Sequence, residues 1–229
     1  MEDGHKFSKY FIVVIGLLAV VSILLAFKLY SWTHPRIYRN PTVKVTLHEG
    51  LTNREMAQVL SSSLKNFDKD LFLNKTKSRQ GYLFPDTYFF LNSTTAEDVV
   101  GVMHMNFNKR LKLLQGDIYN SHHSLADIIT MASVIEKEAS GKSDAPTISG
   151  ILWKRLSIGM PLQVDIDKVT YKEKGLPSAP ISNPGLVAID AAIHPVDSAY
   201  LYYLHDKTGT VHYAENYDIH KKNIAKYLK

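Results

Sequence analysis

The chain has 229 residues, no cysteine and a formal net charge of +5 that is spread along its length. A chain without cysteine has no disulfide bonds or thiolate metal sites, which suits an oxidising compartment. No P-loop, GxGxxG or GxSxG sequence points to nucleotide binding or to a serine hydrolase. The basic charge suits anionic lipid headgroups or an acidic polymer. Because no basic run carries interleaved aromatic residues, we expect no nucleic-acid partner.

An uncharged apolar run from Phe11 to Phe27 is the first element. With its apolar and aromatic flank it predicts a single membrane-spanning helix over residues 11–29, after a short N-terminus of residues 1–10. The alternative is a cleaved signal peptide, but KLYSWTHP follows the run and contains no small-x-small cleavage site. Lys and Arg lie on both sides, so the charge pattern alone leaves the orientation open.

A small strand–helix unit is expected next. Residues 30–42 are polar and interrupted by proline, which is typical of a stalk. Residues 43–47 alternate like a half-buried strand, and residues 48–50 form a turn. Residues 52–55, TNRE, form a capping box that opens a helix. The polar stretch of residues 61–70 ends this unit.

An unusually aromatic segment, GYLFPDTYFF, covers residues 81–90. Core packing explains some of its aromatic side chains and is the interpretation that the pattern favours. The alternative is a wall on which sugar rings stack, with Asp86 and Gln163 supplying hydrogen bonds.

The remaining elements predict an α+β class. Helical patterns cover residues 97–114, 125–139, 147–158 and 220–229. Pro and Gly dominate residues 159–185, which we interpret as a long ordered loop of the kind that often serves function. Residues 200–204 and 210–214 predict two strands joined by a hairpin turn.

The helix over residues 125–139 carries the strongest chemical signal. Its apolar residues form one stripe, and Glu136 lies on the shoulder of that stripe, closer to it than Glu138. Apolar packing beside a carboxyl raises its pKa and allows it to act as a general acid. The alternative, which the pattern alone favours, is a boundary glutamate on an ordinary amphipathic helix.

The ten histidines do not form a recognisable metal motif. The pair His122–His123 cannot share one helical face, and no HExxH spacing occurs. We therefore expect neither a metal nor another cofactor.

Several segments, taken in order, resemble the endolytic murein transglycosylase family (MltG or YceG-like). After the apolar run they are VTLHEGLTNREMAQVL, GYLFPDTY, ASVIEKEA, RLSIGMPLQVD, GLPSAPISNPG and AAIHP. The resemblance implies a LysM-like subdomain at residues 43–79 and a mixed α+β catalytic domain at residues 80–229. It also implies a lyase that cuts the β-1,4 bond between N-acetylmuramic acid and N-acetylglucosamine within glycan strands, leaving 1,6-anhydro ends.

The resemblance assigns roles to individual residues. The family's catalytic glutamate matches Glu136, which acts first as acid and then as base. A peptidoglycan hydrolase (muramidase) is the enzymatic rival, because a second carboxylate normally activates water, and Asp165 is the obvious candidate. The residues expected at or near the substrate are Tyr82, Asp86, Tyr88, Glu138, Gln163, Asp165 and Asn183.

The chain departs from the family pattern in places, which keeps a third possibility open. Gln80 stands where the family has Glu, and the stretch after Asp165 is shortened. A non-catalytic glycan-binding scaffold of cell-wall synthesis is therefore the alternative from another class.

The resemblance also implies partners and a location. The expected partners are peptidoglycan glycan strands, the membrane, peptidoglycan synthases (penicillin-binding proteins) and the elongation or division machinery. Because peptidoglycan lies outside the cytoplasmic membrane, the N-terminus is expected inside and the catalytic domain outside.

Overall fold

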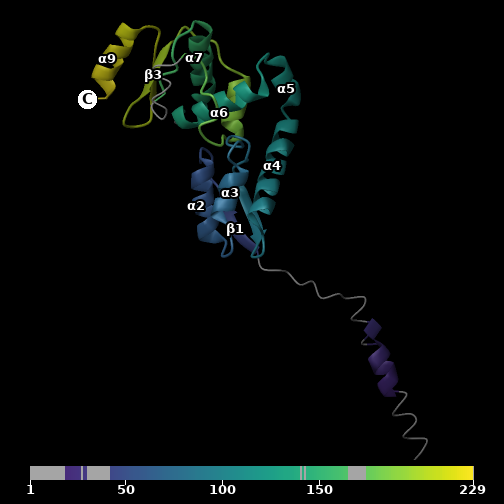
Figure 1. Cartoon of the computed structure of the whole chain (residues 1–229). Coiled ribbons are helices and arrows are strands. Elements are labelled where there is room, and N and C mark those ends of the chain that lie inside the picture. Colours follow the sequence, from purple (N-terminus) through teal and green to yellow (C-terminus); the bar gives the residue numbers. More distant parts are fainter. Residues whose placement is uncertain are drawn as a thin grey trace, which may run out of the picture. The chain divides into compact units, whose positions relative to one another are not determined.

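Figure 1 shows the computed structural model of the chain, which describes residues 19–26, 28–29, 42–139, 141, 143–164 and 174–228. The chain divides into two units, Met1–Pro41 and Thr42–Lys229. Residues 19–26 and 28–29 are helical, and the rest of the predicted anchor lies outside the described residues, as do residues 30–41 of the predicted stalk. Among the helices that are described, none combines the length and the apolar character needed to cross a membrane.

The second unit begins with a two-stranded antiparallel sheet. Strand β1 (Thr42–Thr46), expected from its alternation, pairs with β2 (Thr87–Leu91), so that Val45 lies opposite Tyr88. The inner face of this ribbon contributes to a first hydrophobic core, which also contains Leu47, Met56, Leu60, Phe72, Leu83 and Met103.

Two helices complete the first core. Helix α2 (Asn53–Ser63) begins at the predicted capping box, in which Thr52 and Glu55 bond each other's backbone N–H groups. Helix α3 (Lys69–Lys75) is capped by Asp68 and buries Phe72. The sequence pattern did not predict α3, because a helix of two turns is too short to show a clear period.

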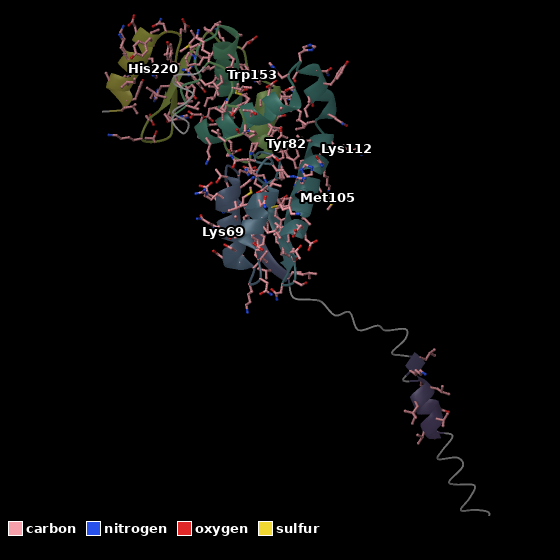
Figure 2. All side chains as sticks on the ribbon, viewed as in Figure 1. Lys69, Tyr82, Met105, Lys112, Trp153 and His220 are labelled. Atoms are coloured by element: carbon pink, nitrogen blue, oxygen red, sulfur yellow. The ribbon has the colours of Figure 1, made fainter. Side chains whose placement is uncertain are left out.

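Helix α4 (Ala96–Lys112) joins the first core to a second one. Its first half buries Val99 and Met103 in the first core. Its second half buries Phe107 and Leu111 in the second core, whereas Met105 lies exposed on its outer side (Figure 2). The short helix α5 (Gln115–Asn120) follows.

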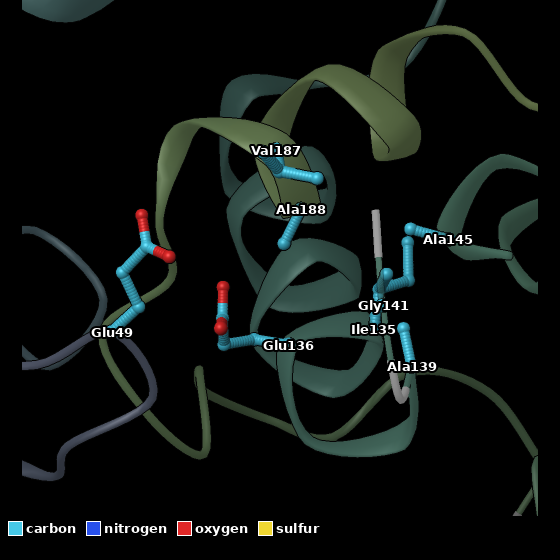
Figure 3. A pocket seen from close by; sticks show the side chains of 8 residues that line it. All are labelled: Glu49, Ile135, Glu136, Ala139, Gly141, Ala145, Val187 and Ala188. Atoms are coloured by element: carbon cyan, nitrogen blue, oxygen red, sulfur yellow. The ribbon is translucent and has the colours of Figure 1, made fainter. Parts of the chain in front are cut away.

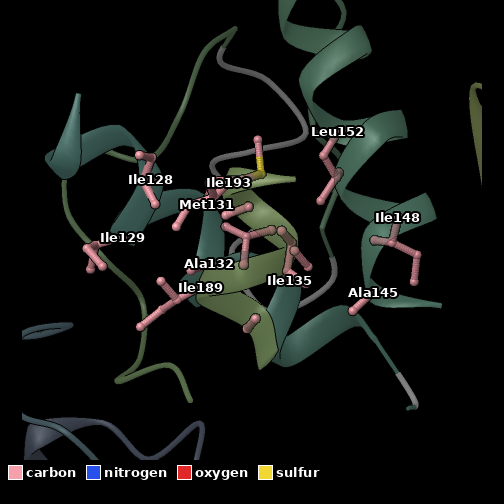
Figure 4. Close-up of a cluster of buried hydrophobic side chains, with 14 of the residues drawn as sticks. Ile128, Ile129, Met131, Ala132, Ile135, Ala145, Ile148, Leu152, Ile189 and Ile193 are labelled. Atoms are coloured by element: carbon pink, nitrogen blue, oxygen red, sulfur yellow. The ribbon is translucent and has the colours of Figure 1, made fainter. Parts of the chain in front are cut away.

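Three helices form most of the second core (Figure 4). Helix α6 (Leu125–Glu138) is capped by Ser124, whose hydroxyl accepts a hydrogen bond from the Asp127 N–H. Helices α7 (Ala145–Ser157) and α8 (Leu186–Ile193) pack against α6. The predicted α+β class is thus confirmed.

The C-terminal part is the predicted hairpin followed by a helix. Strands β3 (Tyr202–His205) and β4 (Val211–Ala214) pair antiparallel, and α9 (Tyr217–Tyr227) begins three residues before the predicted start, at the Asn216 cap. Residues 159–164 and 174–185 contain no helix or strand, as expected, while residues 165–173 lie outside the described part.

Candidate active site

Helix α6 places Glu136 at the edge of the second core. The preceding residue, Ile135, is completely buried, whereas Glu136 is only partly buried. Ala139 ends the helix with an extended backbone. Glu136 therefore lies where an apolar helix face meets an open space, as its position on the stripe predicted.

One backbone group holds the carboxylate of Glu136. The N–H of Gly185, the N-cap residue of α8, donates a hydrogen bond of 2.9 Å to its Oε2. Burial raises the pKa of Glu136, the Gly185 N–H lowers it, Glu49 raises it and Lys137 lowers it, and the net pKa lies above the ordinary value. A carboxyl of this kind retains its proton to higher pH than a solvated glutamate.

Glu136 opens into a cavity of about 200 Å³ (Figure 3). Its other acidic group is Glu49, and in Figure 3 both carboxyl groups project into the same space. The rest of the cavity lining is apolar. The remaining lining residues are Ile135, Ala139, Gly141, Ala145, Val187 and Ala188.

Glu49 is the residue that sequence reasoning missed, because it was assigned only to a turn. The turn places Gly50 at φ 79°, a left-handed conformation that suits glycine, and the Gly50 N–H donates to the Asn183 carbonyl at 2.9 Å. The Asn183 N–H donates in return to the Leu51 carbonyl. No local pattern predicts a contact between segments this far apart in the chain.

Asn183, expected near the substrate, is completely buried. Its side-chain oxygen accepts hydrogen bonds from the N–H groups of Gly81 and Leu83, and its amide donates to the Leu51 carbonyl and to Asn53. Its polar atoms are therefore used to join three chain segments beside the cavity. A direct bond to a sugar stays a prediction.

Glu138 and Gln163 lie at a different cavity from Glu136. Glu138 accepts a hydrogen bond of 2.9 Å from the Tyr203 hydroxyl, and Gln163 has a left-handed backbone with φ 55°. Their cavity measures about 540 Å³ and is partly aromatic. It is lined by Glu138, Arg155, Gln163, Tyr202, Tyr203, Leu204, His205, Tyr217, His220, Ile224 and Leu228.

Tyr82, Asp86 and Tyr88 form a third group, against α4. The ring of Tyr82 meets that of Phe107 edge-on, with 5.3 Å between the ring centroids. The Tyr88 hydroxyl donates to the Phe84 carbonyl, and burial raises the pKa of Tyr88 to about 12. The predicted core packing thus accounts for Tyr88.

Asp86 is fixed by side chains of α4. Asn106 and Arg110 donate hydrogen bonds to its Oδ2 at 3.0 and 2.9 Å. Burial raises the pKa of Asp86, but these donors and the Thr87 N–H outweigh it, so the net pKa is lowered. Asp86 is thus held charged, away from the cavity of Glu136 as lined above.

Two further expectations concern Asp165 and metal binding. Asp165 lies outside the described residues. Within the described ranges, no group of three or more His, Asp or Glu residues is arranged to hold a metal ion.

Comparison with known families finds one clear match. The model of the YceG-like family matches residues 28–167 and 169–226. Among solved structures, a yceG-like protein from Listeria monocytogenes has a TM-score of 0.71 and 26% sequence identity, covering 79% of this chain and 75% of that one.

Two curated relatives carry the same name, endolytic murein transglycosylase. The protein of Bacillus subtilis (strain 168) is 28% identical over 234 residues, which cover 81% of this chain and 65% of the relative. The protein of Streptococcus pneumoniae (strain R6) is 31% identical over 177 residues, 65% of this chain and 32% of the relative. The matches thus span less than two thirds of the length of these relatives.

Proposed function

The chain belongs to the YceG-like family, and from this premise we propose that it is a membrane-anchored lytic transglycosylase that cuts peptidoglycan glycan strands. The observation that carries the proposal is the partly buried carboxyl of Glu136, which opens into a cavity and retains its proton to raised pH. The relatives named endolytic murein transglycosylase support the same substrate class.

The reaction needs one residue that is first an acid and then a base. Protonated Glu136 donates its proton to the oxygen between N-acetylmuramic acid and N-acetylglucosamine as the bond from that oxygen to C1 breaks. The C6 hydroxyl of the muramic acid then bonds its own C1 and gives its proton to the Glu136 carboxylate. A 1,6-anhydro end results, and the Gly185 N–H stabilises the carboxylate between the two steps.

The surroundings of Glu136 favour an internal nucleophile. Ala139, Ala145 and Ala188 bring only apolar side chains to the cavity wall. An apolar wall offers water no hydrogen bonds, whereas the C6 hydroxyl is delivered by the substrate itself at high effective concentration. Attack by the sugar's own hydroxyl is therefore the faster route.

The proposal includes a location and partners. Residues 11–29 anchor the chain, the N-terminus is inside, and the domain after residue 42 faces the nascent glycan on the outer side of the cytoplasmic membrane. The exposed side chains of Val20, Ile23 and Leu24 support an apolar environment for this segment. Peptidoglycan synthases are the proposed neighbours.

A muramidase is the second candidate, and one observation favours it. Glu49 brings a second carboxylate to the cavity of Glu136, in addition to the predicted Asp165. A second carboxylate is what a hydrolase needs to activate water or to attack the sugar. The two candidates differ in their products.

The test is product analysis with the full chain in detergent micelles and purified glycan strands. Mass spectrometry of the wild type is expected to find 1,6-anhydro ends, which are lighter than hydrolytic ends by one water. Products that have gained water would replace the lyase by the muramidase. Glycan binding without any product, unchanged in Glu136→Gln, would indicate the non-catalytic scaffold.

A further inference from the structure

The carboxyl of Glu49 lies directly against the residue that binds Glu136. A Cβ added at Gly185 would overlap Oε1 and Cδ of Glu49, so this carboxyl occupies the space beside the Gly185 backbone. The N–H of the same glycine donates to Glu136. One backbone residue thus lies between the two carboxyl groups and fixes how they approach each other.

The turn that carries Glu49 also touches Glu136. A Cβ added at Gly50 would lie 3.4 Å from Cγ of Glu136. The turn itself is held by the paired backbone hydrogen bonds between residues 50–51 and Asn183. The backbone at Glu49 is therefore held beside Glu136 by main-chain hydrogen bonds.

The two carboxyl groups lie in unequal surroundings. Glu49 is exposed to solvent, whereas Glu136 is partly buried beside Ile135, which disfavours its charged form. A carboxylate close to a partly buried carboxyl disfavours a second negative charge there, so Glu49 favours the proton on Glu136. This division of roles follows from burial and position.

Among the described residues, few other charges face Glu136. Lys137, its neighbour on α6, acts in the opposite direction to Glu49. On the same helix, Glu138 is bound to Tyr203 at the other cavity, and at the start of α7 Asp144 pairs with His205. The first turn of α8, residues 186–188, carries no titratable side chain. Within the described residues Glu49 takes part in no ion pair that would neutralise it.

We propose that Glu49 is a positioning residue whose carboxylate, lying against Gly185, favours the proton on Glu136 and so extends to higher pH the range over which Glu136 acts as the general acid. The inference rests on the proposed function, in which Glu136 donates the proton. With this role for Glu49, the turn after β1 contributes to proton transfer by Glu136 on α6.

The first experiment measures the proton on Glu136 without using activity. The full chain in detergent micelles, labelled with ¹³C at the glutamate carboxyl carbons, is titrated by NMR, and Glu136→Gln identifies the Glu136 signal. Glu49→Gln keeps the shape of the side chain and removes its charge, so the Glu136 midpoint is expected to move to lower pH. Glu215→Gln, an exposed residue beyond β4, is the matched control and leaves the midpoint unchanged. An equal midpoint in wild type and Glu49→Gln overturns the inference.

The second experiment follows glycan cleavage against pH in the same variants. The alkaline limb of the pH–rate profile is expected to move to lower pH in Glu49→Gln. At a fixed pH above this limb, the rate should fall about tenfold for each pH unit by which the limb moves. Equal loss at every pH, with the limb in place, would mean that Glu49 contacts the substrate directly and would overturn the positioning role. A wild type that cleaves no glycan removes the proposed function, while the NMR titration still decides whether Glu49 controls the proton on Glu136.

Discussion

The side-chain amide of Asn183 donates a hydrogen bond of 2.8 Å to the side-chain oxygen of Asn53, across 130 residues of sequence. Asn53 in turn donates to the Thr76 carbonyl, and Asn183 accepts from Gly81 and Leu83. A single pair of buried amides therefore connects the first core to the segment that precedes α8.

Replacing Asn183 by Ala is expected to destabilise the protein strongly. The substitution leaves buried N–H and carbonyl groups without partners, at a cost on the order of 3–5 kcal/mol in the free energy of unfolding. Urea denaturation of the full chain in micelles measures this. Asn108→Ala, an exposed position on α4, is the control and should change the value by less than about 0.5 kcal/mol. A small effect at Asn183 would argue against its joining role.

Glu136→Gln is expected to abolish glycan cleavage and to stabilise the protein at neutral pH. The folded-state pKa of Glu136 is raised, so the folded protein binds the proton more tightly than the unfolded chain, and stability falls as pH rises from the unfolded value through the folded one. Gln carries no charge, so the stability of the variant does not fall in this way as the pH rises. Denaturation at about pH 7.5, well above the ordinary pKa of glutamate, should therefore show the variant to be more stable than the wild type.

The difference between Glu136→Gln and the wild type should shrink on acidification. Below about pH 4, near the ordinary pKa of glutamate, the carboxyl is protonated in both states and its contribution to the pH dependence ends. Glu215→Gln, which is exposed, should show no such pH-dependent difference. A constant difference at all pH values would contradict the raised pKa.

Gly185→Ala is expected to alter catalysis with little loss of stability. The added methyl group overlaps the flexible end of the Glu49 side chain, which swings away, and φ of −82° is allowed for Ala. The pH profile of cleavage should then shift in the same direction as in Glu49→Gln.

Gly150→Ala provides the contrast for Gly185. Its methyl group would overlap the backbone carbonyl of Val196, which cannot move without its chain, so a loss of roughly 1–3 kcal/mol is expected. Thermal unfolding measures both variants. Equal destabilisation of the two variants would show that the Glu49 side chain cannot move away from the added methyl group.

Gln80→Glu, which restores the residue usual in the family, is expected to lower the free energy of unfolding of this protein. The Gln80 amide accepts from the Asn53 N–H and donates to the Pro180 carbonyl at 2.8 Å. A carboxylate cannot donate, and its charge would face that carbonyl, which costs about 1–3 kcal/mol. Gln58→Glu, exposed on α2, should be neutral in the same unfolding assay. An increase in stability would mean that Gln80 has no structural part.

Gln163→Gly tests the second cavity. Gln163 has φ 55°, where a side chain costs about 1 kcal/mol relative to glycine, so the variant should be equally stable or more stable. If Gln163 contacts glycan as predicted, cleavage should still fall, seen as a higher KM. Unchanged kinetics would remove Gln163 from the substrate contacts.

Local signals predicted the elements that begin or end with distinctive residues. The Thr52 capping box and the hairpin turn between residues 204 and 210 were each identified from a few neighbouring positions. Helix α8 was missed because its sequence, LVAIDAAI, is apolar on nearly all sides and shows no helical period. Strand β2 was not predicted, because it lies within the aromatic segment of residues 81–90, whose side chains were attributed to core packing.

The candidate site was predictable only in part, for the same reason. Glu136 could be singled out because its partial burial follows from its place on its own helix. Glu49 lies beside Glu136 only because the folded chain brings two distant segments together. Glu138 and Gln163 line a different cavity from Glu136, and this separation depends on the tertiary structure around α6. Contacts of this kind leave no trace in local periodicity.

Helix α4 connects the parts of the protein that carry Glu49 and Glu136. It is one uninterrupted helix that is embedded in both cores, and the segment with Glu49 belongs to one core and Glu136 to the other. A helix resists bending, so α4 holds the two cores at a set distance from each other. Under the proposed function, a glycan strand would therefore meet the carboxyl groups of Glu49 and Glu136 at a set spacing.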